Sequence, residues 1–266
     1  MDRRLALVTG ASAGIGAALA RIYASHGYDL ALTARREDRL EALADELKLR
    51  YGVEAIAVAA DLTDPTAPDR ILEVVSAHGR QVDALVNNAG YGLPGTFAST
   101  SWADQGAFIQ LMMTAPSALA HKVLPHMVEQ RFGRILNVAS LAGLVPGSAG
   151  HTLYGAVKAY LIKFSQSLHL ETLSSGVHVT ALCPGFTWSE FHDVNGTRDQ
   201  ISRATPDWLW MGADEVAAVG YEAVEANRAV SVPGAPNKAI AAFSKLVPDE
   251  WALALMASQG ARFRKV

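Results

Sequence analysis

Short apolar segments with the character of β-strands alternate with longer helical patterns, and this alternation constrains the fold more than any other feature. The expected strands are Leu5–Thr9, Asp29–Ala34, Glu54–Ala59, Ala84–Asn87, Arg134–Ala139, Val177–Cys183 and Ala229–Val232. The expected helices are Ile15–His26, Arg36–Arg50, Pro65–His78, Trp102–Gln130, Leu153–Ser174 and Ala213–Asn227. Several strands are apolar on both faces, which is typical of a parallel sheet covered by helices on both sides. The pattern therefore predicts an α/β fold with a doubly wound parallel sheet of seven strands and helices on both faces.

No linker, low-complexity stretch or internal repeat interrupts this rhythm, so we expect one domain over residues 1–266. Residues 185–212 lack clear periodicity and contain several large side chains: Trp188, Phe191, Trp208, Trp210 and Met211. The tail after Pro233 is expected to form two short helices, Asn237–Lys245 and Pro248–Ser258.

The composition is that of a globular chain, and it excludes several classes of partner. Half of the residues are hydrophobic and 18% are charged, which supports a large core. A net charge of −3 without a long basic run indicates no nucleic acid or membrane surface as a partner. No apolar stretch approaches about 18 residues, so we expect no membrane span, and a cytoplasmic location by default. The single cysteine, Cys183, allows no intrachain disulfide, and no cluster has metal-ligand spacing.

A glycine-rich turn joins the first expected strand to the first expected helix. It reads Thr9-Gly10-Ala11-Ser12-Ala13-Gly14-Ile15-Gly16, and the short apolar run before it is typical of a strand, not of a signal peptide. Such a turn brings backbone N–H groups close to a pyrophosphate and directs the positive end of the helix dipole at it. The glycines can also serve the turn geometry alone, but their place at the start of the chain favours a dinucleotide site.

Further motifs follow the glycine turn in order: Asn87-Asn88-Ala89-Gly90, the set Ser140, Tyr154 and Lys158, and Pro184-Gly185. With these motifs, residues 5–235 resemble the short-chain dehydrogenase/reductase family, whose glycine turn is T-G-x-x-x-G-x-G. The resemblance implies a Rossmann-like oxidoreductase with a nicotinamide dinucleotide as its cofactor. The cofactor-binding residues that it implies are Gly10, Ser12, Ala13, Gly14, Ile15, Gly16, Asp61, Leu62, Asn88, Ala89, Gly90, Tyr154, Lys158, Pro184 and Gly185.

The end of the second expected strand indicates which dinucleotide binds. NAD(H) is usually held there by an Asp or Glu that bonds the ribose hydroxyls. Here the sequence is Leu32-Thr33-Ala34-Arg35-Arg36, with no carboxylate to repel a 2′-phosphate and two guanidinium groups to receive it. Arg35 and Arg36 therefore predict NADP(H), although either arginine can instead simply solvate the start of a helix.

Tyr154 and Lys158 are four residues apart in a helical pattern and therefore share one helix face. A free tyrosine has a pKa of about 10, and an ammonium about 4 Å away favours the phenolate by at most about 4 kcal/mol. We therefore expect the pKa of Tyr154 to be lowered by up to about three units. The resemblance implies that Tyr154 is the catalytic acid/base, that Lys158 also holds the nicotinamide ribose, and that Ser140 bonds the substrate carbonyl. Taken alone, the Tyr/Lys pair is typical of a structural contact, and Ser140 of a turn.

One position departs from the family pattern. The family commonly has an asparagine in the helix after the fourth strand, on a water-linked proton path to the lysine, and Met112 stands there. Because a thioether is at best a weak acceptor, we expect the chemistry to survive with slower or rerouted proton resupply. The alternative is that Met112 fills a gap in the helix packing. Ser189 replaces the family's usual threonine after Pro-Gly, a milder change that keeps the hydroxyl.

The resemblance implies that residues 185–212 form a mobile lid over the substrate. The aromatic residues of this segment would then line an apolar pocket, which favours a hydrophobic or aromatic ketone or an acyl chain as substrate. Packing of these rings on the body of the protein or on another subunit fits the sequence equally well. The pocket is also expected to be bordered by Tyr91, Val145-Pro146-Gly147, His151 and His192.

Three functions fit the sequence. The first is an NADP(H)-dependent enzyme that interconverts a small-molecule ketone or aldehyde and an alcohol. The second is reduction of a 3-oxoacyl thioester, although no basic cluster marks a pocket mouth for a carrier. The third is a catalytically impaired dinucleotide-binding regulatory or scaffold protein, which Met112 favours and the intact Ser140, Tyr154 and Lys158 oppose. The long apolar helices Trp102–Gln130 and Leu153–Ser174 favour a homodimer or homotetramer.

Overall fold

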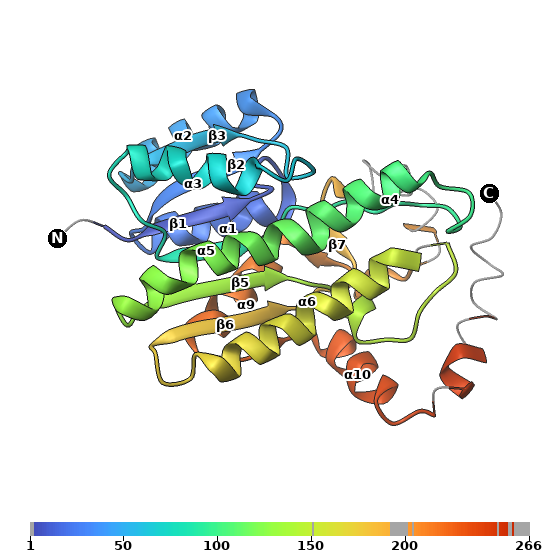
Figure 1. Ribbon diagram of the computed structural model, residues 1–266. Coiled ribbons are helices and arrows are strands. Elements are labelled where there is room, and N and C mark those ends of the chain that lie inside the picture. Colours follow the sequence, from blue (N-terminus) through green and yellow to red (C-terminus); the bar gives the residue numbers. More distant parts are fainter. Residues whose placement is uncertain are drawn as a thin grey trace.

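The computed structural model describes residues 3–150, 152–191, 202–203, 205–248, 250–254 and 257. Its centre is a seven-stranded parallel sheet with the strand order β3-β2-β1-β4-β5-β6-β9 (Figure 1). The strands are β1 (Leu5–Thr9), β2 (Asp29–Ala34), β3 (Ala55–Ala59), β4 (Ala84–Asn87), β5 (Gly133–Val138), β6 (Val177–Leu182) and β9 (Val230–Ser231). The predicted fold class, a doubly wound Rossmann-like sheet of seven parallel strands, is confirmed.

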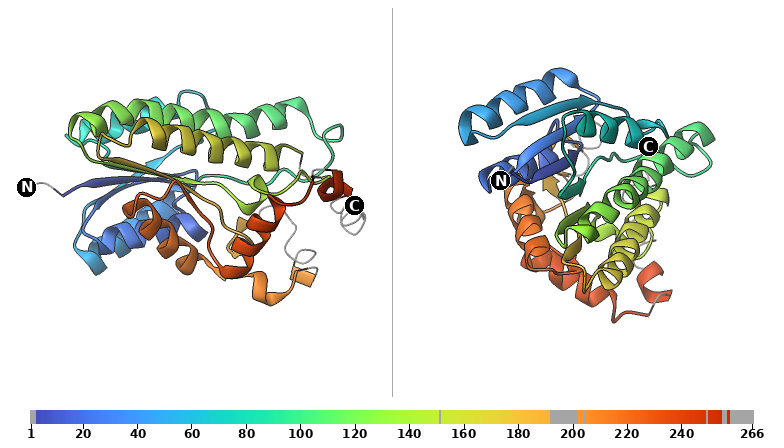
Figure 2. Two further views of the ribbon diagram at one scale, coloured as in Figure 1. Left: turned by 90° about the horizontal axis from the view of Figure 1, so that it is seen from below. Right: turned by 60° about the vertical axis from the view of Figure 1, so that its left-hand side comes forward.

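Helices cover both faces of the sheet, and Figure 2 shows the sheet as the middle of three layers. One outer layer is formed by α1 (Gly14–Ser25), α2 (Glu37–Tyr51) and α9 (Ala213–Glu225). The other is formed by α3 (Ala67–Ala77), α5 (Ala115–Glu129) and α6 (Thr152–Glu171). Alternate strand residues enter opposite layers, so Val8 packs into the core that contains α1 and Leu7 into the core that contains α5.

The strand order places the edge of β1 and β4 at the centre of the molecule. β1 pairs with β2 on one side and with β4 on the other, so consecutive crossovers leave β1 in opposite directions. Open α/β sheets bind ligands at such a switch point, outside the carboxyl ends of the strands. The glycine turn follows β1 and the Asn88-Ala89-Gly90 segment follows β4, and both therefore lie at this crevice.

The single helix predicted over Trp102–Gln130 is interrupted. It consists of α4 (Trp102–Ile109), a π-helical turn η1 (Gln110–Thr114) and α5. The N–H of Ala115 donates to the carbonyl of Gln110, five residues earlier, as π-helical geometry requires. Pro116 accounts for the break, because it has no N–H to donate to the carbonyl four residues before it. The sequence carried this signal, and the prediction of one continuous helix overlooked it.

The segment predicted as a lid begins and ends in a small second sheet. β7 (Thr187–Trp188) pairs in parallel with β8 (Met211–Gly212), and the 3-10 helix η3 (Asp207–Leu209) precedes β8. Residues 192–201 and 204, in the middle of this segment, lie outside the described residues. In the tail, α10 (Ala235–Ser244) corresponds to the first predicted helix. Of the second, Pro248–Ser258, residues 250–254 and 257 are helical, whereas residues 249, 255, 256 and 258 lie outside the described residues.

The described part of the chain contains no helix that is both long and apolar enough to cross a membrane. Within the same residues, no group of three or more His, Cys, Asp or Glu side chains is placed to hold a metal ion. Cys183 is a free, buried thiol, as a chain with one cysteine requires.

Candidate active site

The glycine turn after β1 has a shape that other residues cannot adopt. Gly10 has a φ of 66° and Gly14 a φ of 55°, in the left-handed region that favours glycine. A Cβ atom on Gly16 would lie 2.2 Å from the carbonyl oxygen of Gly10, so α1 can pack against the turn only when this position has no side chain. The glycines thus bring the start of α1 directly onto the end of β1.

The ends of β1 and β4 are tied together beneath this turn. The hydroxyl of Thr9 accepts hydrogen bonds from the N–H groups of Asn88 (2.9 Å) and Ala89 (3.0 Å), and it donates to the carbonyl of Val86 at 3.2 Å. The amide nitrogen of the Asn88 side chain donates back to the carbonyl of Thr9 at 3.0 Å. These bonds fix the two loops that line the crevice.

The start of α1 suits an anionic group. The residue before it, Ala13, has no side chain that caps the helix, and the first turn carries no acidic residue. The N–H groups of a first helical turn have no partner within the helix, and the helix dipole is positive at this end. The observed turn therefore fits the pyrophosphate of a dinucleotide.

The two arginines after β2 differ in their surroundings. Arg35 is exposed, and no ion pair of Arg35 is formed within the described residues. Arg36 donates to the hydroxyl of Ser12 from Nη2 (2.9 Å) and Nε (3.3 Å), and from Nη1 to the carboxylate of Glu190 at 2.9 Å. The second oxygen of Glu190 accepts from Arg39 at 2.6 Å. Sequence reasoning identified neither Glu190 nor Arg39.

Asp61 and Leu62 follow β3 at the same edge of the sheet. One carboxylate oxygen of Asp61 accepts from both the N–H (2.9 Å) and the hydroxyl (2.8 Å) of Thr63, which fixes the side chain in a local turn. Leu62 is buried in the core. The second oxygen of Asp61 has no such bond within the described residues and is available for a polar ligand.

Ser140, Tyr154 and Lys158 come together at the carboxyl end of β5. Ser140 follows β5, and its hydroxyl accepts from the N–H of Ala142 at 3.1 Å. Tyr154 and Lys158 lie on α6, with Nζ of the lysine 5.7 Å from the centre of the tyrosine ring. The lysine Nζ donates to the carbonyl of Val138, the last residue of β5, at 2.8 Å. The last residue of the strand thus orients Lys158, and the turn after the strand orients Ser140.

The expected lowering of the tyrosine pKa by Lys158 is not what the structure shows. Burial raises the pKa of Tyr154, and a hydrogen bond with the Ser140 side chain lowers it by less. Burial lowers the pKa of Lys158 to about 8, against a smaller opposing effect of the nearby Cys183 thiol. Because the ammonium is directed to the Val138 carbonyl and both groups are desolvated, the loss of hydration exceeds any stabilisation of the phenolate.

Met112 lies in the π-helical turn and is almost fully buried, with 1% of its surface exposed. It packs against Gly90, since a Cβ atom on that glycine would lie 2.8 Å from the methionine sulfur. The contact favours the alternative that Met112 fills a gap beside the Asn88-Ala89-Gly90 loop.

Two close approaches complete this edge of the sheet. A Cβ atom on Gly143 would lie 2.6 Å from the carbonyl carbon of Lys158, so this glycine lets α6 approach the 3-10 helix η2 (Leu141–Gly143) that follows β5. The sequence did not indicate Gly143, because its role depends on a contact with Lys158 that forms only when the chain is folded. The carbonyl of Pro184 accepts from the N–H of Leu141 at 2.8 Å, and a Cβ atom on Gly185 would lie 2.4 Å from an oxygen of Asn237. The Pro184-Gly185 motif is thus fixed between the turn that follows Ser140 and α10.

The aromatic residues predicted to form the lid have different surroundings. The Phe191 ring lies 5.8 Å from that of Tyr154. Trp188 and Trp210 stack on each other at 4.1 Å, and Trp210 is buried. Trp208 is largely exposed. Of the other pocket residues predicted, Tyr91 packs edge-on against Phe108, while His151 and His192 lie outside the described residues.

Comparisons with known proteins find relatives with similar sequences and similar folds. The family model for short chain dehydrogenases matches residues 4–199. A sulfoacetaldehyde reductase from Chromohalobacter salexigens is 37% identical over 213 residues, 79% of this chain and 82% of that protein. A short-chain dehydrogenase from Sphingobium yanoikuyae in complex with NADPH is 32% identical, with a TM-score of 0.78 and coverage of 99% of this chain and 96% of that one. A homologue from Burkholderia phymatum in complex with NAD is 25% identical, with a TM-score of 0.79 and coverage of 90% and 92%.

The fold and the site define an oxidoreductase that acts on CH–OH or carbonyl groups with a nicotinamide dinucleotide. The chain belongs to the short-chain dehydrogenase family. The predicted family and enzyme class are confirmed. Complexes with NADPH and with NAD both occur among the similar structures.

Proposed function

We propose that the chain is an NADP(H)-dependent oxidoreductase that interconverts a hydrophobic ketone or aldehyde and the corresponding alcohol. The observation that carries this proposal is the convergence of Ser140, Tyr154 and Lys158 at the carboxyl edge of the sheet. This edge also carries the glycine turn. A proton donor and a dinucleotide site therefore face the same crevice, as hydride transfer to a carbonyl requires.

The cofactor is held by both sides of the crevice in this proposal. On the β1 side we assign Gly10, Ser12, Ala13, Gly14, Ile15, Gly16, Arg35, Arg36, Asp61 and Leu62. On the β4 side and beyond we assign Asn88, Ala89, Gly90, Tyr154, Lys158, Pro184 and Gly185. When bound, the nicotinamide supplies a hydride to the carbonyl carbon or accepts one from the alcohol.

Tyr154 moves the proton. Its raised pKa keeps the phenol protonated at neutral pH, so it can donate to the carbonyl oxygen during reduction. The Ser140 hydroxyl, which lies beside Tyr154, orients the same carbonyl oxygen. Lys158 has further N–H donors beside the one directed to Val138, and these hold the nicotinamide ribose.

The preference for NADP(H) is supported by the end of β2. Arg35 and Arg36 lie there, and no carboxylate stands at the position where NAD(H) enzymes of this fold usually have one. Arg35 is exposed and forms no ion pair within the described residues, so its guanidinium offers donors to a phosphate. Arg36 stands beside Ser12 at the mouth of the glycine turn.

The hydrophobic substrate is supported by the side chains near Tyr154. The centre of the Phe191 ring lies 5.8 Å from that of Tyr154, and Leu93, Phe97 and Leu153 line a small cavity together with Tyr154. Within the described residues, no basic cluster marks this region for an acyl carrier, and the packed Met112 gives no support to a non-catalytic role.

Oxidation of NADPH by the purified chain over a panel of aliphatic, aromatic and bulky ketones and aldehydes tests this proposal. Sulfoacetaldehyde serves as a small anionic comparison. We expect turnover with apolar carbonyl compounds, a lower KM for NADPH than for NADH, and a loss of about 10²- to 10⁴-fold in kcat for Tyr154→Phe. Binding of NADPH without turnover on any carbonyl compound would contradict the proposal.

A further inference from the structure

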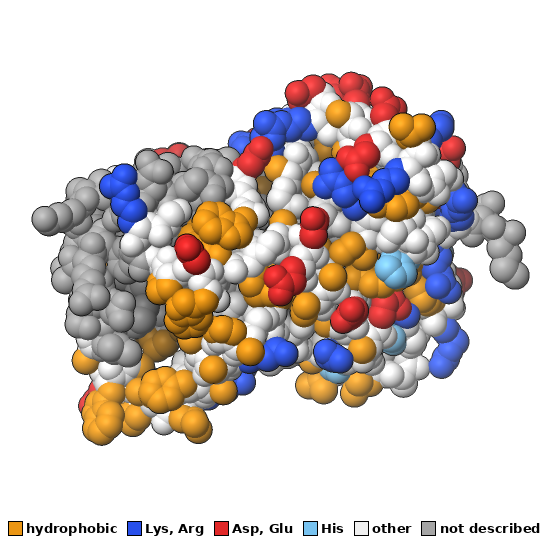
Figure 3. Space-filling view, turned by 180° about the vertical axis from the view of Figure 1, so that it is seen from behind, with side chains coloured by type: hydrophobic (Ala, Val, Ile, Leu, Met, Phe, Trp, Pro, Cys, Tyr) orange, Lys and Arg blue, Asp and Glu red, His pale blue; other side chains and the backbone are white. Residues whose placement is uncertain are grey.

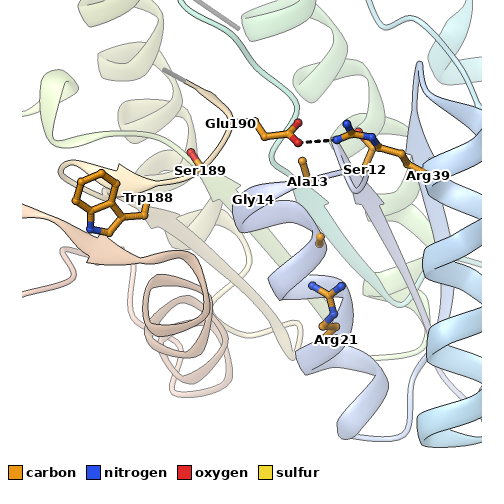
Figure 4. A pocket seen from close by; sticks show the side chains of 9 residues that line it. Ser12, Ala13, Gly14, Arg21, Arg39, Trp188, Ser189 and Glu190 are labelled. Carbon is orange, nitrogen blue, oxygen red and sulfur yellow. Dashed lines mark hydrogen bonds and ion pairs between the residues drawn. The ribbon is translucent and has the colours of Figure 1, made fainter. Parts of the chain in front are cut away.

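Glu190 joins two arginines next to the glycine turn. Its carboxylate accepts from Arg36 at 2.9 Å with one oxygen and from Arg39 at 2.6 Å with the other. Figure 4 shows the carboxylate directed at Arg39, across the top of α1 from Trp188. The two guanidinium groups hold the pKa of Glu190 below its ordinary value, so the residue is anionic at neutral pH.

The same bridge fixes the chain that leads into the lid. Glu190 follows β7 by two residues, and its neighbour Ser189 lies against Gly14, where an added Cβ would approach the serine Cβ to 2.9 Å. The chain after β7 therefore crosses the first turn of α1. An open groove of about 450 Å³ remains beside it, lined in part by Arg21, Arg39 and Trp188.

The bridge gives the two arginines after β2 different tasks. Arg36 shares its donors between Ser12 and Glu190. The negative charge of Glu190 therefore repels an anion that binds at Arg36. Arg35 forms no ion pair within the described residues and is free to bind a phosphate. A 2′-phosphate, with a charge of nearly −2, thus meets a cluster in which one of three guanidinium charges is already neutralised.

We infer that Glu190 is a positioning residue that limits the selectivity of this site for NADP(H) over NAD(H), by binding Arg36 and Arg39 with a carboxylate of the protein itself. The inference rests on the proposed function, because it assumes that the 2′-phosphate binds at Arg35 and Arg36. NAD(H) has no charge at this position, so Glu190 affects its binding little. The selectivity between the two dinucleotides is therefore the property that Glu190 sets.

Calorimetric titration of Glu190→Gln with NADP⁺ and with NAD⁺ tests the inference without reference to turnover. Glutamine keeps the shape and removes the charge. We expect the Kd for NADP⁺ to fall by about threefold to tenfold, which is the size of a single-charge effect on a dianion near the protein surface. The Kd for NAD⁺ should change less than about twofold, and raising the salt concentration should reduce the gain for NADP⁺.

Glu46→Gln is the matched control, because it removes the same charge from a nearby pair. Glu46 accepts from Arg21 at 2.7 and 2.8 Å, and Arg21 lines the same groove, but neither residue contacts Arg36. This variant should leave the ratio of the Kd for NAD⁺ to the Kd for NADP⁺ unchanged. Arg39→Gln should act in the opposite direction to Glu190→Gln and weaken NADP⁺ binding by about threefold. Without Arg39, the charge of Glu190 is balanced by Arg36 alone.

An unchanged or lower selectivity for NADP⁺ in Glu190→Gln would overturn the inference, as would an equal gain in Glu46→Gln. The unmodified protein separates this failure from that of the proposed function. If it binds neither dinucleotide, or prefers NAD⁺, the proposed function fails first. If it prefers NADP⁺ but Glu190→Gln does not raise the ratio of the Kd for NAD⁺ to the Kd for NADP⁺, only the inference about Glu190 fails.

Discussion

Lys158 is held where its charge is unfavourable. The side chain is 5% exposed, and its ammonium donates to the carbonyl of Val138 in the interior of the site. Burial lowers its pKa to about 8, because desolvation disfavours the charged form. The rest of the fold therefore has to offset the burial of an ammonium group at neutral pH, as is common where a site is arranged for chemistry.

Replacing this lysine should stabilise the protein. The native pKa of about 8 lies below the unfolded value of 10.5, so the buried charge destabilises the fold fully below pH 8 and ceases to do so as the pH rises toward 10.5. Lys158→Met should therefore raise the free energy of unfolding at pH 7 by at most about 3 kcal/mol, with a smaller gain at pH 10. Urea denaturation at both pH values measures the difference. A loss of stability at pH 7 would show that the bond to Val138 outweighs desolvation.

The raised pKa of Tyr154 makes the two reaction directions differ in pH dependence. Reduction needs the phenol, which persists through neutral pH, whereas alcohol oxidation needs the phenolate. We expect kcat/KM for alcohol oxidation to rise continuously between pH 7 and pH 10, since this ratio reports the free enzyme. Initial rates across this range give the profile. A plateau below pH 8 would mean that the phenolate is stabilised in the free protein.

At the scale of elements, the π-helical turn between α4 and α5 determines what stands beside the cofactor loop. It places Met112 against Gly90, and Ser117 supports it by donating to the carbonyl of Met113 at 2.6 Å. π-Helical turns within α-helices are frequent at functional sites. Here the π-helical turn immediately precedes Pro116 in the sequence, apart from Ala115. The side chain that the turn directs inward, Met112, is apolar.

Shortening Met112 should create a cavity. We expect Met112→Ala to lower the free energy of unfolding by about 2–5 kcal/mol and Met112→Leu by less than about 1.5 kcal/mol, as for other buried sites. Chemical denaturation of both variants checks this. Met112→Asn separates packing from proton relay, because an unchanged kcat and pH profile would discard the relay hypothesis. A Met112→Ala variant as stable as the parent would contradict the packing role.

The contact between the glycine turn and α1 should be sensitive to one methyl group. In Gly16→Ala the added Cβ would meet the Gly10 carbonyl at 2.2 Å, and backbone has little room to move. We expect loss of dinucleotide binding, measured by calorimetry, and destabilisation of roughly 3 kcal/mol or more. Gly106→Ala in α4 is the matched control. An added Cβ there meets nothing within 4 Å, so alanine should be neutral or stabilise the helix by up to about 1 kcal/mol.

At the scale of the whole molecule, apolar side chains remain uncovered on several helices. Leu170 in the last turn of α6 and Leu173 just after it are more than half exposed. So are Phe243 in the last turn of α10 and Leu246 just after it. Figure 3 shows apolar side chains gathered at the lower left of the back face, at the end of the molecule where α10 lies in Figure 1. Larger exposed apolar surfaces are typical of contacts between proteins.

We propose that the chain forms one domain and assembles as a homodimer or homotetramer through such helical faces. Sedimentation velocity should give a particle with two or four times the 28.3 kDa mass of the chain. Unfolding followed by tryptophan fluorescence and by far-ultraviolet circular dichroism should show coincident transitions, as one cooperative unit requires. A 28.3 kDa particle at micromolar concentration would contradict the assembly, and two separated transitions would contradict the single domain.

Much of the architecture could be predicted because it depends on local patterns. β1, β2 and β4 begin and end at the predicted residues, since each is a short apolar run bounded by charged or turn-forming residues. The interruption of the α-helix before Pro116 was signalled equally locally, by the proline itself. The helical periodicity on both sides nevertheless led to the prediction of one continuous helix. Boundaries such as that of β9, with two residues instead of the four expected, depend on pairing with β6 and could not be read locally.

By itself, the sequence determined the fold class and the glycine turn, because the order and spacing of local patterns encode them. Through the family resemblance it also predicted Ser140, Tyr154 and Lys158 as the catalytic residues. Tertiary structure alone decided the direction of the Tyr154 pKa, because burial and the Lys158–Val138 bond arise only when α6 packs on β5. It also brought Glu190 to Arg36, across 154 positions of sequence. Local patterns fix strands and turns, whereas electrostatic partners are fixed by which chain segments the packed sheet brings together.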